Sequence, residues 1–166
     1  RDHIETYFSP STDSVEKFYV KYALLETNLL GDPEMNFFTG IKEKVIWTGL
    51  SESARVEGDT LIKDDGSITV GRAVSAQRFS GNGGMEFTVG EDTSYYLCGL
   101  TSDTGDAAGV FSGYKFMLNN GNMALYKKDH IVPLAGRMYR AGDVLSVTRS
   151  GMEFIFSQNG QEIHRY

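Results

Sequence analysis

Apolar side chains take alternate positions in the stretch Tyr114-Lys115-Phe116-Met117-Leu118-Asn119, which is followed at once by Asn120-Gly121. Such alternation, in which Met117 is the exception among the polar positions, places one set of side chains against a core and the other toward solvent. Asparagine followed by glycine supplies the positive φ angles of a tight hairpin turn. The stretch therefore predicts an antiparallel strand that turns back into a second strand.

The same pattern recurs along most of the chain after Gly40. Apolar and polar residues alternate in Met85-Glu86-Phe87-Thr88-Val89 and, with one apolar exception, in Met152-Glu153-Phe154-Ile155-Phe156-Ser157. Further hairpin turns are indicated at Asn82-Gly83 and Asn159-Gly160. Roughly ten short strands with no helical pattern between them are typical of an all-β sandwich or barrel.

The segment before residue 41 has a different pattern. Between residues 14 and 30, apolar side chains recur at spacings of three and four: Val15, Phe18, Tyr19, Tyr22, Leu25 and Leu29. This spacing predicts a short helix, although Phe18, Val20, Tyr22 and Leu24 also alternate as they would in a strand. We therefore divide the chain into an N-terminal helical or linker segment, residues 1–40, and a β domain, residues 41–166. We expect this helix to pack on the sandwich, to pair with the same helix in another copy or, in a longer protein, to connect the sandwich to its neighbour.

Charge and hydropathy exclude two classes of partner. The net charge is −6, and the 16 lysines and arginines are scattered rather than gathered on one segment, which disfavours nucleic acid. No run approaches the roughly 20 apolar residues that a membrane-spanning helix needs, so we expect no membrane insertion. Cys98 is the only cysteine, and its apolar surroundings predict a buried side chain rather than a reactive thiol.

The order of several short motifs resembles the concanavalin A-like lectin/glucanase superfamily, in particular its SPRY-like branch. The motifs run in sequence over about residues 41–166: Val45-Ile46-Trp47, Gly58-Asp59-Thr60-Leu61-Ile62-Lys63, Gly71-Arg72-Ala73-Val74-Ser75-Ala76-Gln77, Gly84-Met85-Glu86-Phe87-Thr88-Val89, Gly99-Leu100-Thr101, Leu125-Tyr126-Lys127, residues 139–143 and Gln158-Asn159-Gly160. The resemblance implies an antiparallel jelly-roll β-sandwich. That scaffold hosts lectins, glycosidases and protein-binding domains, so the resemblance implies fold more than function.

Catalysis is not indicated by the acidic residues. Glycoside hydrolysis needs two carboxyl groups that flank the scissile bond. Jelly-roll glucanases supply these groups from a strand with the pattern Glu-x-Asp-x-Glu, in which the alternation directs all three acidic side chains into one cleft. The nearest match is Glu57-Gly58-Asp59, which lacks the third acid and falls in an expected turn. The three histidines are dispersed and accompany no nucleophile motif. We therefore expect no enzymatic activity.

Carbohydrate recognition has candidate residues of the right chemistry. Aromatic rings cover the apolar face of a sugar, while arginine and carboxylate groups bind its hydroxyls. The candidates for ligand binding are Arg78, Tyr95, Tyr96, Asp103, Tyr126 and Tyr139. Asp103 and Asp106 lie in a loop rich in hydroxyls and are candidate ligands for calcium, which prefers oxygen donors.

Two functions remain open from the sequence. The first is a non-catalytic module that binds a glycan, as part of a larger surface or secreted protein and hence extracellular. The second is a SPRY-like module that binds or assembles with a protein through the loops around Asp92, Asp103 and Asp129. No cofactor is indicated apart from calcium.

Overall fold

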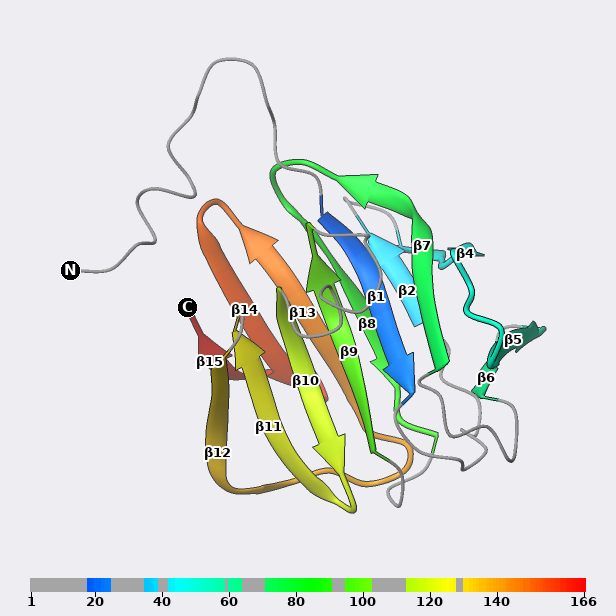
Figure 1. Ribbon diagram of the computed structural model, residues 1–166. Helices are drawn as coiled ribbons and strands as arrows, with labels where there is room; N and C mark the ends of the chain where they lie inside the picture. Colours follow the sequence, from blue (N-terminus) through cyan, green and yellow to red (C-terminus); the bar gives the residue numbers. More distant parts are fainter. Residues whose placement is uncertain are drawn as a thin grey trace.

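The computed structural model describes residues 18–24, 35–38, 42–58, 60–63, 71–90, 95–102, 113–127 and 130–166. All the regular secondary structure in these residues is β-strand (Figure 1). The strands are β1 Phe18–Leu24, β2 Met35–Phe38, β3 Lys42–Lys44, β4 Trp47–Thr48, β5 Ala54–Glu57, β6 Thr60–Lys63, β7 Gly71–Phe79, β8 Gly83–Thr88, β9 Tyr95–Thr101, β10 Tyr114–Asn119, β11 Asn122–Lys127, β12 His130–Met138, β13 Val144–Ser150, β14 Glu153–Gln158 and β15 Gln161–Arg165.

The strands form two large antiparallel sheets that lie face to face (Figure 1). The seven-stranded sheet has the order β12-β11-β10-β9-β1-β7-β4, and the six-stranded sheet has the order β15-β14-β13-β8-β2-β3. Strands β5 and β6 make a separate hairpin at the side of this pair of sheets. The expectation of an all-β sandwich is thus confirmed at the level of two packed antiparallel sheets.

The N-terminal segment differs from its expected structure. Residues 18–24, which the spacing predicts to be helical, form strand β1 between β7 and β9. The alternation of Phe18, Val20, Tyr22 and Leu24 is typical of a strand. The position of β1 between two other strands favours this structure further, because its backbone gains hydrogen bonds along both edges. The rest of the predicted helix lies outside the described residues. Strand β2, expected to be part of a connection, pairs with β3 and β8, so the sheets contain strands from both sides of residue 41.

Two of the expected hairpin turns have the predicted backbone. Asn120 and Gly121 have φ angles of 46° and 75° between β10 and β11, and Asn159 and Gly160 have angles of 53° and 76° between β14 and β15. Consecutive positive φ angles match the twist of a two-residue hairpin, and asparagine and glycine tolerate them best. These turns fix the register in which β10 meets β11 and β14 meets β15.

The core between the sheets consists largely of aromatic rings. Phe116 of β10 packs edge-to-face on Phe87 of β8 and on Phe156 of β14, with ring centroids 6.1 Å and 5.2 Å apart. Tyr114 stacks on Phe154 of the opposite sheet, with centroids 3.7 Å apart. The alternate residues Tyr114, Phe116 and Leu118 therefore face the core, as the sequence pattern predicts. The alternate set is not solvated as expected, because Lys115 is buried and Met117 is half-buried.

The structure also bears on the single cysteine and on the question of a membrane-spanning helix. Cys98 is fully buried in the core, and no helix among the described residues is both long and apolar enough to pass through a bilayer. Trp47 of β4 is partly buried and packs against the core.

Candidate functional site

Strand β12 leaves regular pairing with β11 close to its C-terminal end. Pro133 pairs with Ala124, and Met138 pairs with Asn122. Residues 134–137 of β12 therefore stand opposite the single residue Met123. Such a bulge bends a strand and redirects its side chains, and bulges are over-represented at sheet edges and beside binding sites. Within it, Gly136 has a φ of +70°, a backbone conformation that residues with a side chain rarely adopt.

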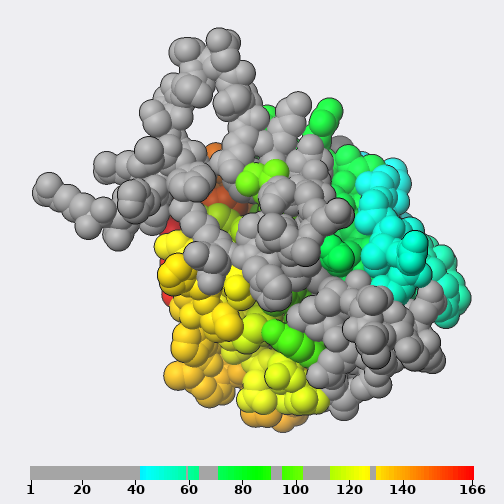
Figure 2. Space-filling model, in the orientation of Figure 1, coloured from blue at the N-terminus to red at the C-terminus, as the bar shows by residue number. Residues whose placement is uncertain are grey.

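The bulge is held at both ends. Leu134 is partly buried and packs against the hydrophobic core, while Ala135, Gly136, Arg137 and Met138 are exposed. Because β12 is the outermost strand of its sheet, nothing in the described sheet pairs with its other edge. The bulge is thus anchored in the core but presents four consecutive residues to solvent, at the lower left corner of the view in Figure 2.

Gln158, the last residue of β14, ties the bulge to the six-stranded sheet. Its carboxamide Nε2 donates to the carbonyl oxygen of Met138 at 3.1 Å and to Asp143 Oδ2 at 2.9 Å. Its Oε1 accepts a hydrogen bond from Arg137 Nη1 at 3.2 Å. One side chain therefore fixes both the backbone and the guanidinium group of the bulge.

The carboxylate of Asp143 accepts three hydrogen bonds, one of them from Gln158. Besides Gln158, the backbone N–H of Arg140 donates to Asp143 Oδ2 at 2.9 Å, and Asn159 Nδ2 donates to Oδ1 at 2.8 Å. Partial desolvation by itself raises the pKa of the Asp143 carboxyl group, but the three donors and the nearby charge of Arg140 outweigh it, so the pKa is lowered. Asp143 is therefore ionised at neutral pH and serves as the acceptor at the centre of the network.

A shallow hollow of about 280 Å³ lies over the bulge. Its lining residues are Ala135, Gly136, Arg137, Met138 and Gln158. Gly136 leaves room there, since no atom lies within 4 Å of the position that a Cβ would occupy. The hollow thus combines a guanidinium group, a carboxamide and peptide groups with one flexible thioether.

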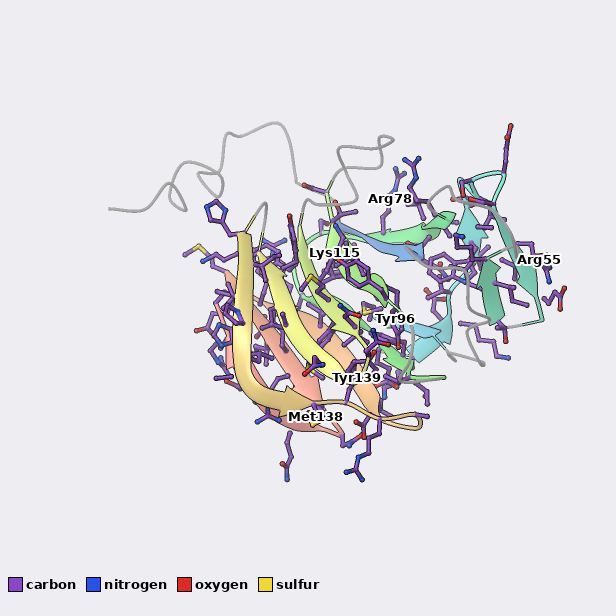
Figure 3. The ribbon with its side chains drawn as sticks, turned by 60° about the horizontal axis from the view of Figure 1, so that its bottom comes forward. Arg55, Arg78, Tyr96, Lys115, Met138 and Tyr139 are labelled. Carbon is purple, nitrogen blue, oxygen red and sulfur yellow. The ribbon has the colours of Figure 1, made fainter. Side chains whose placement is uncertain are left out.

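The tyrosines expected to bind ligand do not form a common site. Tyr96 and Tyr139 are each 1% exposed and pack edge-to-face in the core with centroids 6.5 Å apart, so a surface ligand cannot reach them. Figure 3 shows both rings between the sheets. Tyr96 takes an inward position of strand β9, and Tyr139 directly follows the end of β12, so both rings belong to the core.

Three of the other candidates lie on the outer side of the seven-stranded sheet, away from its core. Tyr126 is 8% exposed, and Tyr95 is half-buried with its hydroxyl 3.5 Å from Met117 Sδ. Arg78 is exposed near the end of β7. Tyr126 pairs with Lys115 and Tyr95 with Asn119, on different strands and different rows of the sheet, so the structure does not bring these residues together.

The expected calcium ligands, Asp103 and Asp106, lie outside the described residues, as do Asp92 and Asp129. Within the described part of the chain, no three histidine, cysteine, aspartate or glutamate side chains gather in a way that could hold a metal ion. Glu57, from the acidic pair considered for hydrolysis, is exposed and forms an ion pair with Arg55 at 2.8 Å. Burial raises the pKa of the Cys98 thiol well above its usual value, against a smaller opposing effect of Lys115, so this thiol stays protonated.

Sequence reasoning missed the residues that line the hollow. A signal was present, because Gly136 interrupts an otherwise strand-like run and an isolated glycine in such a run indicates a bulge. Nothing local indicated that Gln158 would lie beside Arg137, since the two residues come from different sheets.

Comparison with protein-family models, with curated proteins and with solved structures found no match for this chain.

Proposed function

We propose that this domain is a non-catalytic recognition module that binds carbohydrate in the hollow over the β12 bulge. The observation that carries the proposal is the convergence of the Arg137 guanidinium, the Gln158 carboxamide and the peptide groups of residues 135–136 on one open depression. The Arg137 guanidinium can donate to sugar hydroxyls, and Gln158 Oε1 and the peptide oxygens can accept from them, whereas Gln158 Nε2 already donates within the protein. The Met138 thioether supplies an adaptable apolar contact beside them.

The rigidity of the site supports this function. Gln158 uses both ends of its carboxamide within the protein, so the guanidinium it contacts is held before any ligand arrives. A site that is fixed in advance loses less conformational entropy on binding. The hollow is open rather than enclosed, which lets a longer glycan chain continue past the bound residue.

The proposed scaffold is the jelly-roll of the concanavalin A-like superfamily, which the order of motifs resembles. The two packed antiparallel sheets are compatible with it. We place the module in a larger surface or secreted protein, where glycans are encountered. A role in hydrolysis is not favoured at the hollow, since Asp143 has a lowered pKa and a general acid needs a raised one.

Screening residues 1–166 on a glycan array, with and without calcium, tests the proposal. We expect binding to a defined set of glycans, and a requirement for calcium would support Asp103 and Asp106 as its ligands. Ala135→Trp places a large side chain at the exposed bulge and is expected to weaken binding at least about tenfold. Ala76→Trp, at an exposed position of β7, is the matched control and should bind like the wild type. Absence of glycan binding in both conditions would refute the function.

A second candidate is a SPRY-like protein-interaction module. Ile131 and Met138 of β12 are 53% and 61% exposed, and exposed apolar side chains on an edge strand favour contact with another protein. The loops first expected to make this contact, around Asp92, Asp103 and Asp129, lie outside the described residues. Ile131→Asp should abolish capture of a protein partner while leaving glycan binding unchanged, which separates the two candidates.

A further inference from the structure

Arg137 is the charged residue in the lining of the hollow. Its Nη1 donates to Gln158 Oε1 at 3.2 Å, which orients the planar guanidinium group and leaves its other N–H groups for a ligand. We propose that Arg137 makes the hollow selective for glycans with a carboxylate group, such as uronic acids. This inference rests on the proposed function, because it names the class of carbohydrate that the same site takes.

The chemistry of the guanidinium group favours a carboxylate. Two parallel N–H groups of arginine match the two oxygens of a planar carboxylate, and such charge-assisted pairs are roughly twice as strong as neutral hydrogen bonds. A sugar hydroxyl presents only one oxygen to this fork and carries no charge. A sulfate can also meet the fork with two oxygens, so the sulfated arm of the test separates the two anions. Lysine would carry the same charge without the fork geometry.

The charges around Arg137 leave the site positive. Asp143 is the nearest carboxylate in the network, and its oxygens already accept hydrogen bonds from Gln158, Asn159 and the backbone of Arg140. Arg140 offsets the charge of Asp143, and its proximity is one cause of the lowered pKa of that carboxyl group. The positive charge of Arg137 is therefore available to an incoming anion even though the whole chain has a charge of −6.

The volume sets the size of the bound group. At about 280 Å³ the hollow is slightly smaller than most small-molecule sites, which occupy roughly 300–1,000 Å³. It is suited to one sugar residue and not to an extended oligosaccharide. We therefore expect the site to recognise a single acidic residue, with the rest of the glycan in solvent.

The test is calorimetric titration of residues 1–166 with three matched oligosaccharides. One ends in glucuronic acid, one ends in glucose, and one carries a sulfate in place of the carboxylate. We expect the acidic oligosaccharide to bind about tenfold to a hundredfold more tightly than the neutral one. Arg137→Gln should remove this preference, weakening binding of the acidic oligosaccharide at least about tenfold more than binding of the neutral one. Arg137→Lys should restore only part of it.

Arg55→Gln is the matched control, because Arg55 lies on the β5–β6 hairpin, on the other side of the molecule from Met138 (Figure 3). It removes the same charge from the protein and should keep the full preference. Equal binding of the acidic and neutral sugars by the wild type would refute the inference and leave the proposed function intact. Equal binding of the sulfated and carboxylated sugars would refute the selection of a carboxylate. A loss of preference in Arg55→Gln would show that net charge, not Arg137, is responsible.

Discussion

Gly99 of β9 lies directly against the backbone of β10. It pairs with Lys115, and a Cβ at this position would collide with the Tyr114 carbonyl oxygen and stand 2.5 Å from Lys115 Cα. Both obstacles are backbone atoms, so the two strands would have to separate. We expect Gly99→Ala to lower the free energy of unfolding by about 3 kcal/mol or more, measured by urea denaturation.

A glycine with a different constraint provides the control. Gly81 has a φ of +89° but open space around its Cβ position, so Gly81→Ala meets backbone strain and no collision. Its cost should be about 1–2 kcal/mol. A loss of similar size in the two variants would contradict the steric explanation for Gly99.

Asp143 couples the candidate site to pH. We expect Asp143→Asn to lower the free energy of unfolding at neutral pH by about 1 kcal/mol, because an amide cannot accept from every donor that the carboxylate satisfies. The folded-state pKa of Asp143 is lowered, so its contribution is fully present above the unfolded-state pKa, about 3.9, and is lost as the pH falls through the folded-state value.

Urea denaturation of the wild type and of Asp143→Asn between neutral and acidic pH measures this contribution. The two stability curves should differ near pH 7 and converge once the carboxyl group is protonated. Glu57→Gln is the control, because Glu57 is an exposed carboxylate with one ion-pair partner and should change stability little. A difference that persists unchanged at low pH would exclude the ionised carboxylate as its source.

At the scale of single elements, the β12 bulge links the core to the hollow. Deleting Ala135 and Gly136 would shorten the bulge by two residues, which preserves the alternation of side chains between the two faces of the strand. We expect the variant to keep its β-sheet circular dichroism spectrum but to lose glycan binding by at least about tenfold, because Arg137 would no longer be placed beside Gln158.

The control for this deletion is Gly136→Ala, which keeps the length of the bulge and introduces only the strain of a φ of +70°. It should cost about 1–2 kcal/mol of stability and retain most of the binding. Retention of full binding by the deletion variant would mean that the bulge does not form the site.

Two strands show when local sequence patterns are sufficient to predict secondary structure and when they are not. The strand Tyr114–Asn119 and its Asn120-Gly121 turn could be predicted, because the side-chain period and the turn residues agree with each other. Residues 18–24 carry both a helical spacing and a strand alternation. Pairing with β7 and β9 decides in favour of the strand, and this tertiary contact involves residues far away in the chain.

The candidate site was harder to predict than the fold for the same reason. Tyrosine is equally suited to a binding platform and to a core, and only burial separates the two roles, as it does for Tyr96 and Tyr139. Arg137 and Gln158 are common polar residues. They become neighbours only because the two sheets pack together and bring their side chains within hydrogen-bond distance. Local patterns report the side of a strand on which a residue lies, but not which residues become neighbours across the sandwich.

At the scale of the whole molecule, the order of the sheets predicts how much of the chain is needed for folding. Strand β1 is hydrogen-bonded between β7 and β9, and β2 is hydrogen-bonded between β8 and β3. A fragment of residues 41–166 would lack both strands, and the seven-stranded sheet would be interrupted between β9 and β7. Interior edges of this kind expose unpaired backbone groups and favour aggregation.

We therefore expect residues 41–166 to be aggregated or to show no cooperative thermal unfolding, whereas residues 15–166, which keep β1 and β2, should unfold cooperatively. Lys21→Pro in the full chain isolates the role of β1, because proline in a strand with neighbours on both sides cannot donate its ladder hydrogen bond. This variant should resemble the short fragment in size-exclusion chromatography and thermal denaturation. A monomeric, cooperatively folded 41–166 fragment would instead mean that the sandwich closes without β1, and that residues 1–40 are an appendage.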